Sequence, residues 1–280
     1  MSESVLQPGH VAVVTGAGSG IGAALAEAFG AAGGRVVLAD VEEGALARVG
    51  RTLSDAGVEY LTVPTDVSDL EAVERLARAT VERFGRVDVL CNNAGVSTFN
   101  ALADQTMADW RWVLGVNLWG VVNGVQTFVP IMRAQGTPAH VVNTSSIAGL
   151  WSGIAFIGPY AVSKVGVVSL SETLNAELRA EQSPIGVSVL CPSSVDTKVL
   201  DGERNRPTSF GAEHRTDTAE YVRNMIRDGL VGPDGKSPAE VAAMTLDAIR
   251  SDRFWIITHA SARATLEARF ASILADIPVE

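Results

Sequence analysis

The chain has 280 residues, of which 47% are hydrophobic and 19% are charged. This length and composition indicate a globular protein of one large domain or two small ones. Lys and Arg total 22 against 32 Asp and Glu residues, which gives a formal net charge of −10. An acidic chain without a basic block is a poor partner for nucleic acid, because phosphate binding needs clustered Lys and Arg. We therefore expect no nucleic-acid partner.

Other classes are excluded by what the chain lacks. No apolar run reaches the roughly 18–20 residues of a membrane span, so no membrane partner is expected. Residues 1–9 hold an acid and no basic residue, unlike a signal peptide, and we expect a cytoplasmic protein. Cys91 and Cys191 each end an apolar run and are expected to be buried, inert thiols. The four histidines lack metal-ligand spacing, so no metal site is expected.

Short apolar runs alternate with longer amphipathic stretches along most of the chain. The first half predicts a strand at 10–15, a helix at 20–32, a strand at 35–39, a helix at 42–56, a strand at 58–63, a helix at 69–83, a strand at 87–91 and helix over roughly 106–134. The second half predicts a strand at 139–145, a helix at about 159–181, a strand at 185–191, a helix at 237–250, a strand at 254–258 and a helix at about 260–275. Ser68 or Asp69 is the expected N-cap of the third helix.

The expected strands are continuous runs of Val, Ile and Leu, which indicates burial on both faces of a parallel sheet. The fold class predicted is therefore α/β, with a doubly wound (Rossmann) seven-stranded parallel sheet flanked by helices. No Pro/Gly/Ser linker divides the chain, so residues 1–280 are expected to form a single domain. Residues 192–236 break the rhythm and predict an irregular lid with at most short helices.

A glycine-rich motif, TGAGSGIG from Thr15 to Gly22, joins the first strand to the first helix. Glycines let main-chain N–H groups approach a pyrophosphate, and the helix N-terminus adds partial positive charge. The residues assigned to the cofactor here are Gly16, Ser19, Gly20, Ile21 and Gly22. Asp40 ends the second strand, where a carboxylate can bind ribose hydroxyls and repel a 2′-phosphate. The cofactor expected is therefore NAD rather than NADP.

A second constellation can carry proton chemistry. Tyr160 and Lys164 are four residues apart and share one helix face, and Ser146 follows the fifth strand, where such a sheet opens its crevice. A tyrosine hydroxyl has a reference pKa near ~10. A nearby ammonium group and a positively charged nicotinamide both favour the phenolate. Tyr160 could then take a proton from an alcohol or give one to a ketone.

Together these motifs resemble the classical short-chain dehydrogenase/reductase family, and the resemblance spans about 8–275. Besides the glycine motif, the matching positions are Asp66-Val67, Asn92-Asn93-Ala94-Gly95, Asn117, the group of Ser146, Tyr160 and Lys164, and Pro192-Ser193-Ser194-Val195-Asp196-Thr197. The last segment departs from the family pattern, because Ser193 replaces the usual glycine.

The resemblance implies catalytic roles for four of these residues. Tyr160 is the implied general acid/base, and Lys164 lowers its pKa and binds the nicotinamide ribose. Ser146 holds the substrate oxygen, with Ser145 as the alternative by position. Asn117 either anchors a water of a proton relay or is a structural helix residue. The implied cofactor contacts are Asp66 and Val67 at the adenine, Asn93, Ala94 and Gly95 after the fourth strand, and Pro192, Val195 and Thr197 at the nicotinamide.

The implied substrate is a secondary alcohol or ketone. Its pocket is expected from three stretches: 96–99, 151–156 and 198–236. The aromatic and branched residues in them favour an apolar or aromatic substrate, or else belong to the core or to a subunit interface. The charges of the lid, among them Arg204, Arg206 and Arg215, are interpreted as a solvated face.

The resemblance also implies self-association, as a homotetramer or, second, a dimer. The long helices at 106–134 and 159–181 and the C-terminal unit at 237–280 are expected to form the interfaces. Two other functions were weighed on the same fold: a dinucleotide-sensing binding protein, and an epimerase or dehydratase. The presence of both Tyr160 and Lys164 disfavours the first, and the chain length disfavours the second.

Overall fold

The computed structural model of the protein describes residues 5–230 and 232–278. Residues 1–4 of the segment compared with a signal peptide, Val231 of the lid and the last two residues of the C-terminal unit lie outside this description. Within the described ranges, no helix combines the length and the apolar character needed to cross a membrane.

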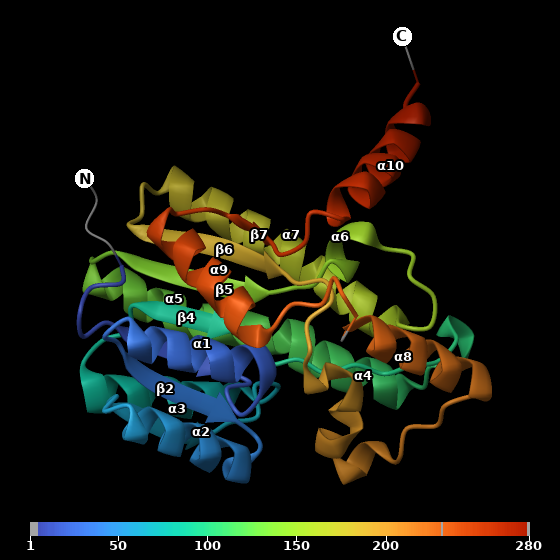
Figure 1. Cartoon of the computed structure of the whole chain (residues 1–280). Helices are drawn as coiled ribbons and strands as arrows, with labels where there is room; N and C mark the ends of the chain where they lie inside the picture. The colour runs from blue at the N-terminus through green and yellow to red at the C-terminus, as the bar shows by residue number, and fades with distance from the viewer. Residues whose placement is uncertain (1–4, 231, 279–280) are drawn as a thin grey trace.

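In the described residues, seven parallel strands form one sheet through the centre of the molecule (Figure 1). They are β1 (Val11–Thr15), β2 (Arg35–Asp40), β3 (Tyr60–Pro64), β4 (Val89–Asn92), β5 (Ala139–Thr144), β6 (Ile185–Cys191) and β7 (Trp255–Ile257). Their order is β3-β2-β1-β4-β5-β6-β7, so the chain order reverses between β1 and β4. The doubly wound α/β class is confirmed, and its ligand crevice lies outside the carboxyl ends of β1 and β4.

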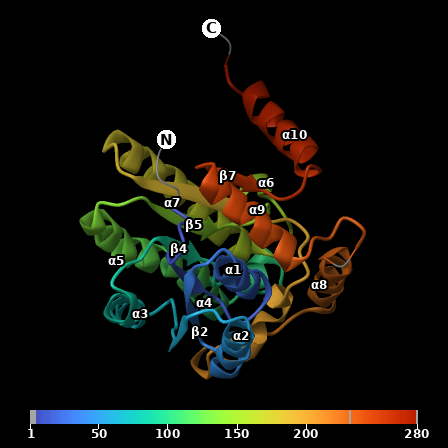
Figure 2. The same ribbon diagram turned by 60° about the vertical axis from the view of Figure 1, so that its left-hand side comes forward.

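Helices cover both faces of the sheet (Figure 2). The α-helices are α1 (Gly20–Ala31), α2 (Glu43–Asp55), α3 (Leu70–Phe84), α4 (Met107–Leu114), α5 (Gly120–Gln135), α6 (Ala148–Trp151), α7 (Gly158–Ala180), α8 (Asp217–Leu230), α9 (Pro238–Arg250) and α10 (Ala262–Ala275). The core on one face joins the sheet to α1, α2 and α9, and the core on the other joins it to α3, α5 and α7. Cys91 and Cys191 are buried free thiols, as expected.

Most predicted elements lie within two residues of their observed bounds, and Asp69 is the N-cap of α3. The prediction of at most short helices in the lid is wrong, because α8 is a 14-residue helix. Its inner face carries Ala219, Arg223, Ile226 and Leu230, of which the first two are buried and the last two line the cavity described below. This spacing of 4, 3 and 4 is helical. Because the buried Arg223 lies in the middle of this inner face, the face does not read as an apolar helical pattern in the sequence.

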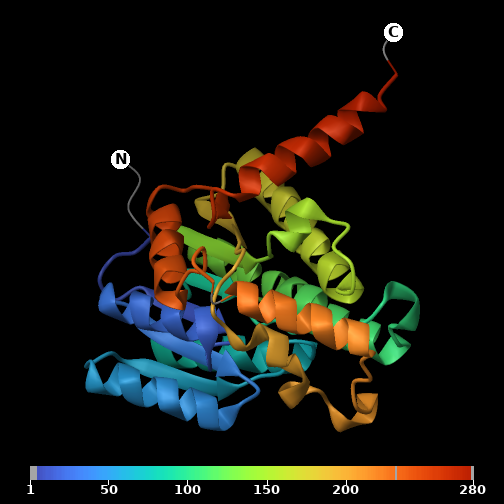
Figure 3. The ribbon, with the colours of Figure 1, turned by 45° about the vertical axis from the view of Figure 1, so that its right-hand side comes forward.

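Three short segments matter for the site: the π-helical turn η2 (Gly115–Trp119) and the 3₁₀ segments η3 (Lys198–Asn205) and η4 (Thr208–Phe210). The turn η2 interrupts the helix predicted over 106–134 between α4 and α5. The segments η3, η4 and α8 form the lid beside the sheet (Figure 3), whereas α10 projects away from the body in every view.

Candidate active site

A cavity of about 860 Å³ opens at the carboxyl ends of the strands. It is lined by most of the residues predicted from the sequence: Gly16, Ser19, Gly20, Ile21, Asp40, Asp66, Val67, Asn93, Ala94, Gly95, Ser146, Tyr160, Lys164, Pro192, Val195 and Thr197. Two predicted residues, Gly22 and Asn117, are buried and do not line the cavity. The topology therefore brings together motifs from six separate βα connections.

The glycine motif forms a tight turn under the first helix. A Cβ atom at Gly22 would lie 2.1 Å from the carbonyl oxygen of Gly16, and one at Gly16 would lie 2.8 Å from Ala94 Cα. Ser19 is the N-cap of α1 but makes no capping hydrogen bond, and the first turn carries no acidic side chain. The N–H groups of this turn are thus left for an outside acceptor. An anionic pyrophosphate fits this position.

Asp40 is held in a fixed orientation at the end of β2. Its Oδ2 atom accepts a hydrogen bond from Gly18 N at 2.9 Å, and its Oδ1 atom accepts one from Glu42 N at 3.0 Å. The carboxylate still lines the cavity. Such a group can accept hydrogen bonds from ribose hydroxyls, and its charge opposes a phosphate at the same place.

The loop after β4 is tied to β1 and to η2. Thr15 Oγ1 accepts hydrogen bonds from Asn93 N at 2.9 Å and Ala94 N at 3.1 Å. Asn117, fully buried in η2, accepts from Val96 N at 2.8 Å and donates to Val96 O at 2.9 Å and Ser163 Oγ at 3.0 Å. The amide of Asn117 is therefore used inside the protein, which supports the structural reading of this residue.

Ser146, Tyr160 and Lys164 converge on one wall of the cavity. Lys164 lies one helical turn beyond Tyr160 on α7, and its Nζ atom is 5.5 Å from the centre of the tyrosine ring. The Lys164 ammonium donates a hydrogen bond to the carbonyl of Thr144 at 2.8 Å. Ser145 also lines the cavity, but its hydroxyl is engaged inside the protein, where it donates to Lys164 O at 2.8 Å. This arrangement favours Ser146, not Ser145, as the serine that faces a substrate.

Burial dominates the titration of both groups on α7. Burial raises the pKa of Tyr160, and a hydrogen bond with Ser146 lowers it. Burial also lowers the pKa of Lys164, from 10.5 to about 8. From the sequence, the Lys164 ammonium and a positively charged nicotinamide are both expected to favour the phenolate. In the structure the tyrosine instead keeps its proton through burial, and further positive charge is needed to favour the phenolate.

The segment after β6 tolerates serine in place of glycine. Ser193 does not have a positive φ, so it needs no glycine-like backbone, and its N–H donates to Thr258 Oγ1 at 3.2 Å. Thr197 packs against the glycine motif, because a Cβ atom at Gly20 would lie 3.1 Å from Thr197 Cγ2. This loop therefore lines the cavity beside the glycine motif.

The far wall of the cavity is apolar. It is lined by Val96, Phe99, Trp112, Trp151, Ile154, Ile157, Val199, Leu200, Phe210, Ile226 and Leu230. All three stretches predicted to line the pocket contribute, although Thr98 and Phe156 do not. Of the tryptophans, Trp112 is buried in this wall, whereas Trp119 on η2 is 59% exposed.

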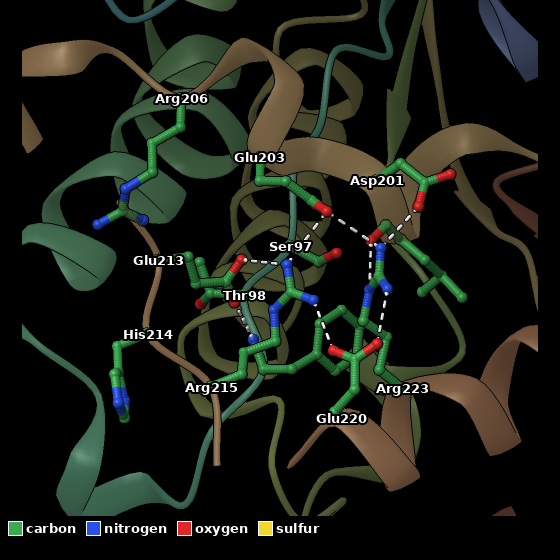
Figure 4. A network of polar contacts seen from close by, with 12 residues as sticks. Ser97, Thr98, Asp201, Glu203, Arg206, Glu213, His214, Arg215, Glu220 and Arg223 are labelled. Carbon is green, nitrogen blue, oxygen red and sulfur yellow. Dashed lines mark hydrogen bonds and ion pairs between the residues drawn. The ribbon is translucent and has the colours of Figure 1, made fainter. Parts of the chain in front are cut away.

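Several of the lid charges are buried in ion pairs, which corrects the prediction of a solvated face for Arg206, Arg215 and Glu213 (Figure 4). Arg215 pairs with Glu203, Glu213 and Glu220, and Arg223 pairs with Asp201, Glu203 and Glu220. The side chain of Arg223 is only 7% exposed and that of Glu213 only 4%. Glu213 also accepts a hydrogen bond from Phe99 N at 2.9 Å. These charges fasten the lid to the loop after β4.

A separate buried ion pair holds the turn between η3 and η4. Arg206 lies 2.7 Å from Asp109 of α4, with side chains 4% and 8% exposed. The guanidinium also stacks over the Trp112 ring, 5.3 Å from its centre. Sequence reasoning missed this pair and the contact of Thr144 with Lys164. The first joins residues far apart in the chain and the second uses a main-chain carbonyl, so neither leaves a motif.

Comparison with known proteins agrees with this geometry. Residues 10–207 match the short chain dehydrogenase family. The Cα-dehydrogenase of a Sphingobium species is 33% identical over 273 residues, which cover 97% of this chain and 88% of that protein. The 1-deoxy-11-beta-hydroxypentalenate dehydrogenase of Streptomyces exfoliatus is 36% identical over 266 residues, covering 94% and 88%.

The fold is matched by a solved structure. A short chain dehydrogenase/reductase from Burkholderia phymatum, in complex with NAD, superposes with a TM-score of 0.92 at 43% identity. The match covers 98% of this chain and 97% of that one. The sheet order, the glycine turn and the match over residues 10–207 together identify the chain as a member of the short chain dehydrogenase family of oxidoreductases.

Proposed function

We propose that the protein transfers a hydride between NAD and a secondary alcohol or ketone with a bulky apolar or aromatic body. The observation that carries the proposal is one cavity with Asp40 at one end, Ser146, Tyr160 and Lys164 on its wall, and an apolar chamber beyond them. When bound, the nicotinamide accepts or delivers the hydride, because no side chain can carry one.

The residues of α7 and β5 supply the proton chemistry. Ser146 holds the substrate oxygen, and the Tyr160 hydroxyl donates a proton to a ketone oxygen or, as the phenolate, takes one from an alcohol. Lys164, with a pKa of about 8, places a positive charge near the tyrosine at neutral pH and reaches toward the ribose side of the site. Asn117 keeps the loop at Val96 in place beside them, and a proton relay through a water beside it remains part of the proposal.

Two observations support NAD over NADP. The oriented Asp40 carboxylate would repel a 2′-phosphate, and the Burkholderia phymatum relative was solved with NAD. The proposed contacts are the glycine turn for the pyrophosphate, Asp66 and Val67 for the adenine, and Pro192, Val195 and Thr197 for the nicotinamide.

The substrate class follows from the apolar chamber. The lid arginines Arg206, Arg215 and Arg223 lie outside the cavity lining and are paired with carboxylates. Arg204, the lid arginine that lines the cavity, is paired with Glu42. Aromatic and branched side chains line the chamber instead, and such walls hold a ligand mainly through apolar burial.

We also propose that the protein assembles as a homotetramer, or failing that a dimer, in the cytoplasm. Large apolar side chains stand exposed on neighbouring helices, including Trp119, Val162 and Val165. Burial against a second copy would remove this surface from water. The two buried free thiols are consistent with a reducing compartment.

The test is absorbance at 340 nm with a panel of secondary alcohols and ketones, first with NAD and then with NADP. We expect turnover of aromatic or alicyclic members with NAD, and a loss of at least about 100-fold in Tyr160→Phe. Cofactor binding without turnover on any member, with Tyr160→Phe unchanged, would contradict the enzymatic proposal.

A further inference from the structure

The lid and the start of α2 meet at one carboxylate. Glu42 Oε1 accepts a hydrogen bond from Arg204 Nε at 2.9 Å and another from Asn205 Nδ2 at 2.8 Å. Its partners lie 162 and 163 residues further along the chain. The side chains of Glu42 and Arg204 are each 33% exposed, so this contact sits at the rim of the cavity and is partly screened by water.

The side chain of Glu42 takes no part in capping its own helix. Glu42 is the N-cap residue of α2, yet its side chain makes no capping hydrogen bond and points to the lid instead. Its main-chain N–H meanwhile donates to Asp40 Oδ1 at 3.0 Å. Glu42 therefore contacts the Asp40 carboxylate through its main chain and the lid through its side chain.

The segment η3 is attached to the cavity wall at both ends, and Arg223 of α8 holds its middle through Leu200 O and Asp201. At its start, Ser97 Oγ donates to Val199 O at 2.7 Å, on the side where the substrate chamber begins. At its end, Arg204 and Asn205 reach Glu42 beside Asp40. Arg204 is oriented for this by donating from Nη1 to the carbonyls of Lys198 and Asp201, at 3.0 and 2.9 Å.

We propose that Glu42, Arg204 and Asn205 form a latch that holds η3 across the cofactor cleft and so sets the rate at which the dinucleotide leaves. The inference rests on the proposed NAD function. Lys198, Arg204, Asn205 and Asp40 line the same cavity, so a dinucleotide that reaches Asp40 lies beside η3. The three latch residues are positioning residues. They act by keeping η3 in place and take no part in proton or hydride transfer.

The Glu42 carboxylate of the latch is ionised at neutral pH. The hydrogen bond from Asn205 and the positive charges of Arg204 and Lys198 lower the pKa of Glu42. The latch therefore contains one ionised pair and one charge-assisted hydrogen bond, both of which weaken when the carboxylate is removed. Salt should also weaken the pair, since it is partly exposed.

The experiment measures NADH release by stopped-flow fluorescence in the wild type, Glu42→Ala, Glu42→Gln, Asn205→Ala and the control Glu43→Gln. Glu43 is the exposed neighbouring carboxylate, outside the cavity lining. We expect release to accelerate about three- to tenfold in Glu42→Ala, and less in Glu42→Gln and Asn205→Ala, because exposed pairs contribute modestly. Glu43→Gln should match the wild type. Potassium chloride should speed release from the wild type more than from Glu42→Ala.

Hydrogen–deuterium exchange supplies a second readout that needs no turnover. With NADH bound, exchange at residues 198–210 should rise in Glu42→Ala and Asn205→Ala and stay unchanged in Glu43→Gln. Asn205→Ala leaves α2 intact, so it tests the latch even if Glu42→Ala fails to fold. Equal release rates and equal exchange in all variants that bind NADH would overturn the latch alone. Failure of the wild type to bind NADH would instead contradict the proposed cofactor.

Discussion

The Nζ atom of Lys164 donates a hydrogen bond of 2.8 Å to the main-chain carbonyl of Thr144, the last residue of β5. This contact places an ammonium group, buried with only 3% of the residue exposed, beside the serine pair that follows the strand. Burial lowers the pKa of Lys164 to about 8. Keeping the buried lysine charged at neutral pH therefore lowers the free energy of unfolding of the protein. Function and stability therefore oppose each other at this residue.

The first prediction concerns Lys164→Met. The folded pKa of about 8 lies below the unfolded value of 10.5, so the unfolded chain binds more protons between these two pH values. Burial raises the pKa of the Cys91 and Cys191 thiols, so these two groups lower the stability of wild type and variant alike above about pH 9. The contribution of Lys164 to stability, given by the difference between wild type and variant, should rise with pH from about 8 to 10.5, and its full cost, on the order of 3 kcal/mol, should apply below pH 8. In Lys164→Met this dependence should vanish, and the activity should fall by at least about 100-fold.

Urea unfolding at intervals between pH 7 and pH 10.5 checks this prediction, with Lys236→Met as the control. Lys236 is partly exposed, and its substitution should preserve the pH dependence of the wild type. An unchanged slope in Lys164→Met would show that this lysine is not the group responsible.

The second prediction concerns cofactor choice and Asp40→Ala. Removing the carboxylate takes away the repulsion of a 2′-phosphate and the acceptor for ribose hydroxyls. The ratio of kcat/KM with NAD to kcat/KM with NADP should fall about tenfold or more, which corresponds to about 1.4 kcal/mol. Asp66→Asn is the matched control for this ratio, because Asp66 lines the same cavity and its proposed contact is with the adenine, which NAD and NADP share. An unchanged ratio in Asp40→Ala would refute the assignment.

The third prediction separates two roles of Asn117. Its amide both accepts from and donates to Val96, so Asn117→Ala leaves the main-chain groups of Val96 without partners in a buried place. We expect a loss of about 2–3 kcal/mol in unfolding free energy together with lower activity. Asn117→Asp keeps the acceptor for Val96 N but loses the donor to Val96 O and Ser163. If Asn117 acts only by holding the loop, activity across both variants should track stability; activity lost without a loss of stability would point to the proton relay.

The sequence was sufficient for those parts of the site that lie in local motifs. The residues from Thr15 to Gly22 and the pair of Tyr160 and Lys164 have fixed spacing, because a turn and a helix impose it. The doubly wound parallel sheet was predicted from continuous apolar runs that alternate with helices. Each of these features is set by neighbours within about ten residues.

The lid could not be predicted in the same way. Arg206 pairs with Asp109 and Arg215 with Glu203, Glu213 and Glu220, and the chain order gives no sign that these charges become buried. Burial of a charge becomes possible only when a partner is brought to it by the fold. The helix α8 was hidden for the same reason, since its inner face includes Arg223.

The pair of Asp109 and Arg206 gives the fourth prediction. Both side chains are at least nine-tenths buried, so Arg206→Met leaves the Asp109 carboxylate without its partner and removes the stacking on Trp112. We expect a loss of about 3–5 kcal/mol in unfolding free energy, because an uncompensated charge stays buried. The double variant Arg206→Met with Asp109→Asn should recover part of this loss, because the amide removes the buried charge but keeps an acceptor for Thr106 N in the capping box of α4. A single variant as stable as the wild type, by chemical denaturation, would show that the pair is not buried in solution.

The last prediction concerns acid stability and His140. Its Nε2 atom lies 2.8 Å from Ser188 Oγ, and the Ser188 hydroxyl donates to Arg253 O at 2.7 Å, so Nε2–H of the imidazole donates to Ser188. Burial lowers the pKa of His140 to about 4 from 6.5, although the nearby Asp252 opposes this shift. The unfolded chain therefore binds more protons than the folded one between about pH 4 and pH 6.5. Stability should fall as the pH drops through this window, by about 3 kcal/mol in all.

Glutamine at position 140 can still donate to Ser188 but does not titrate, so His140→Gln should lose this part of the pH dependence. Its stability at pH 7 should be lower than that of the wild type, because the smaller side chain packs less well. The difference between the two proteins should then shrink as the pH falls toward 4. His214→Gln is the control: the residue is exposed, and its substitution should leave the curve of the wild type unchanged. The measurement is urea unfolding of both proteins at pH 7, 6, 5 and 4.5. If the difference in unfolding free energy between His140→Gln and the wild type stays constant over this range, His140 is not the group responsible for the acid sensitivity.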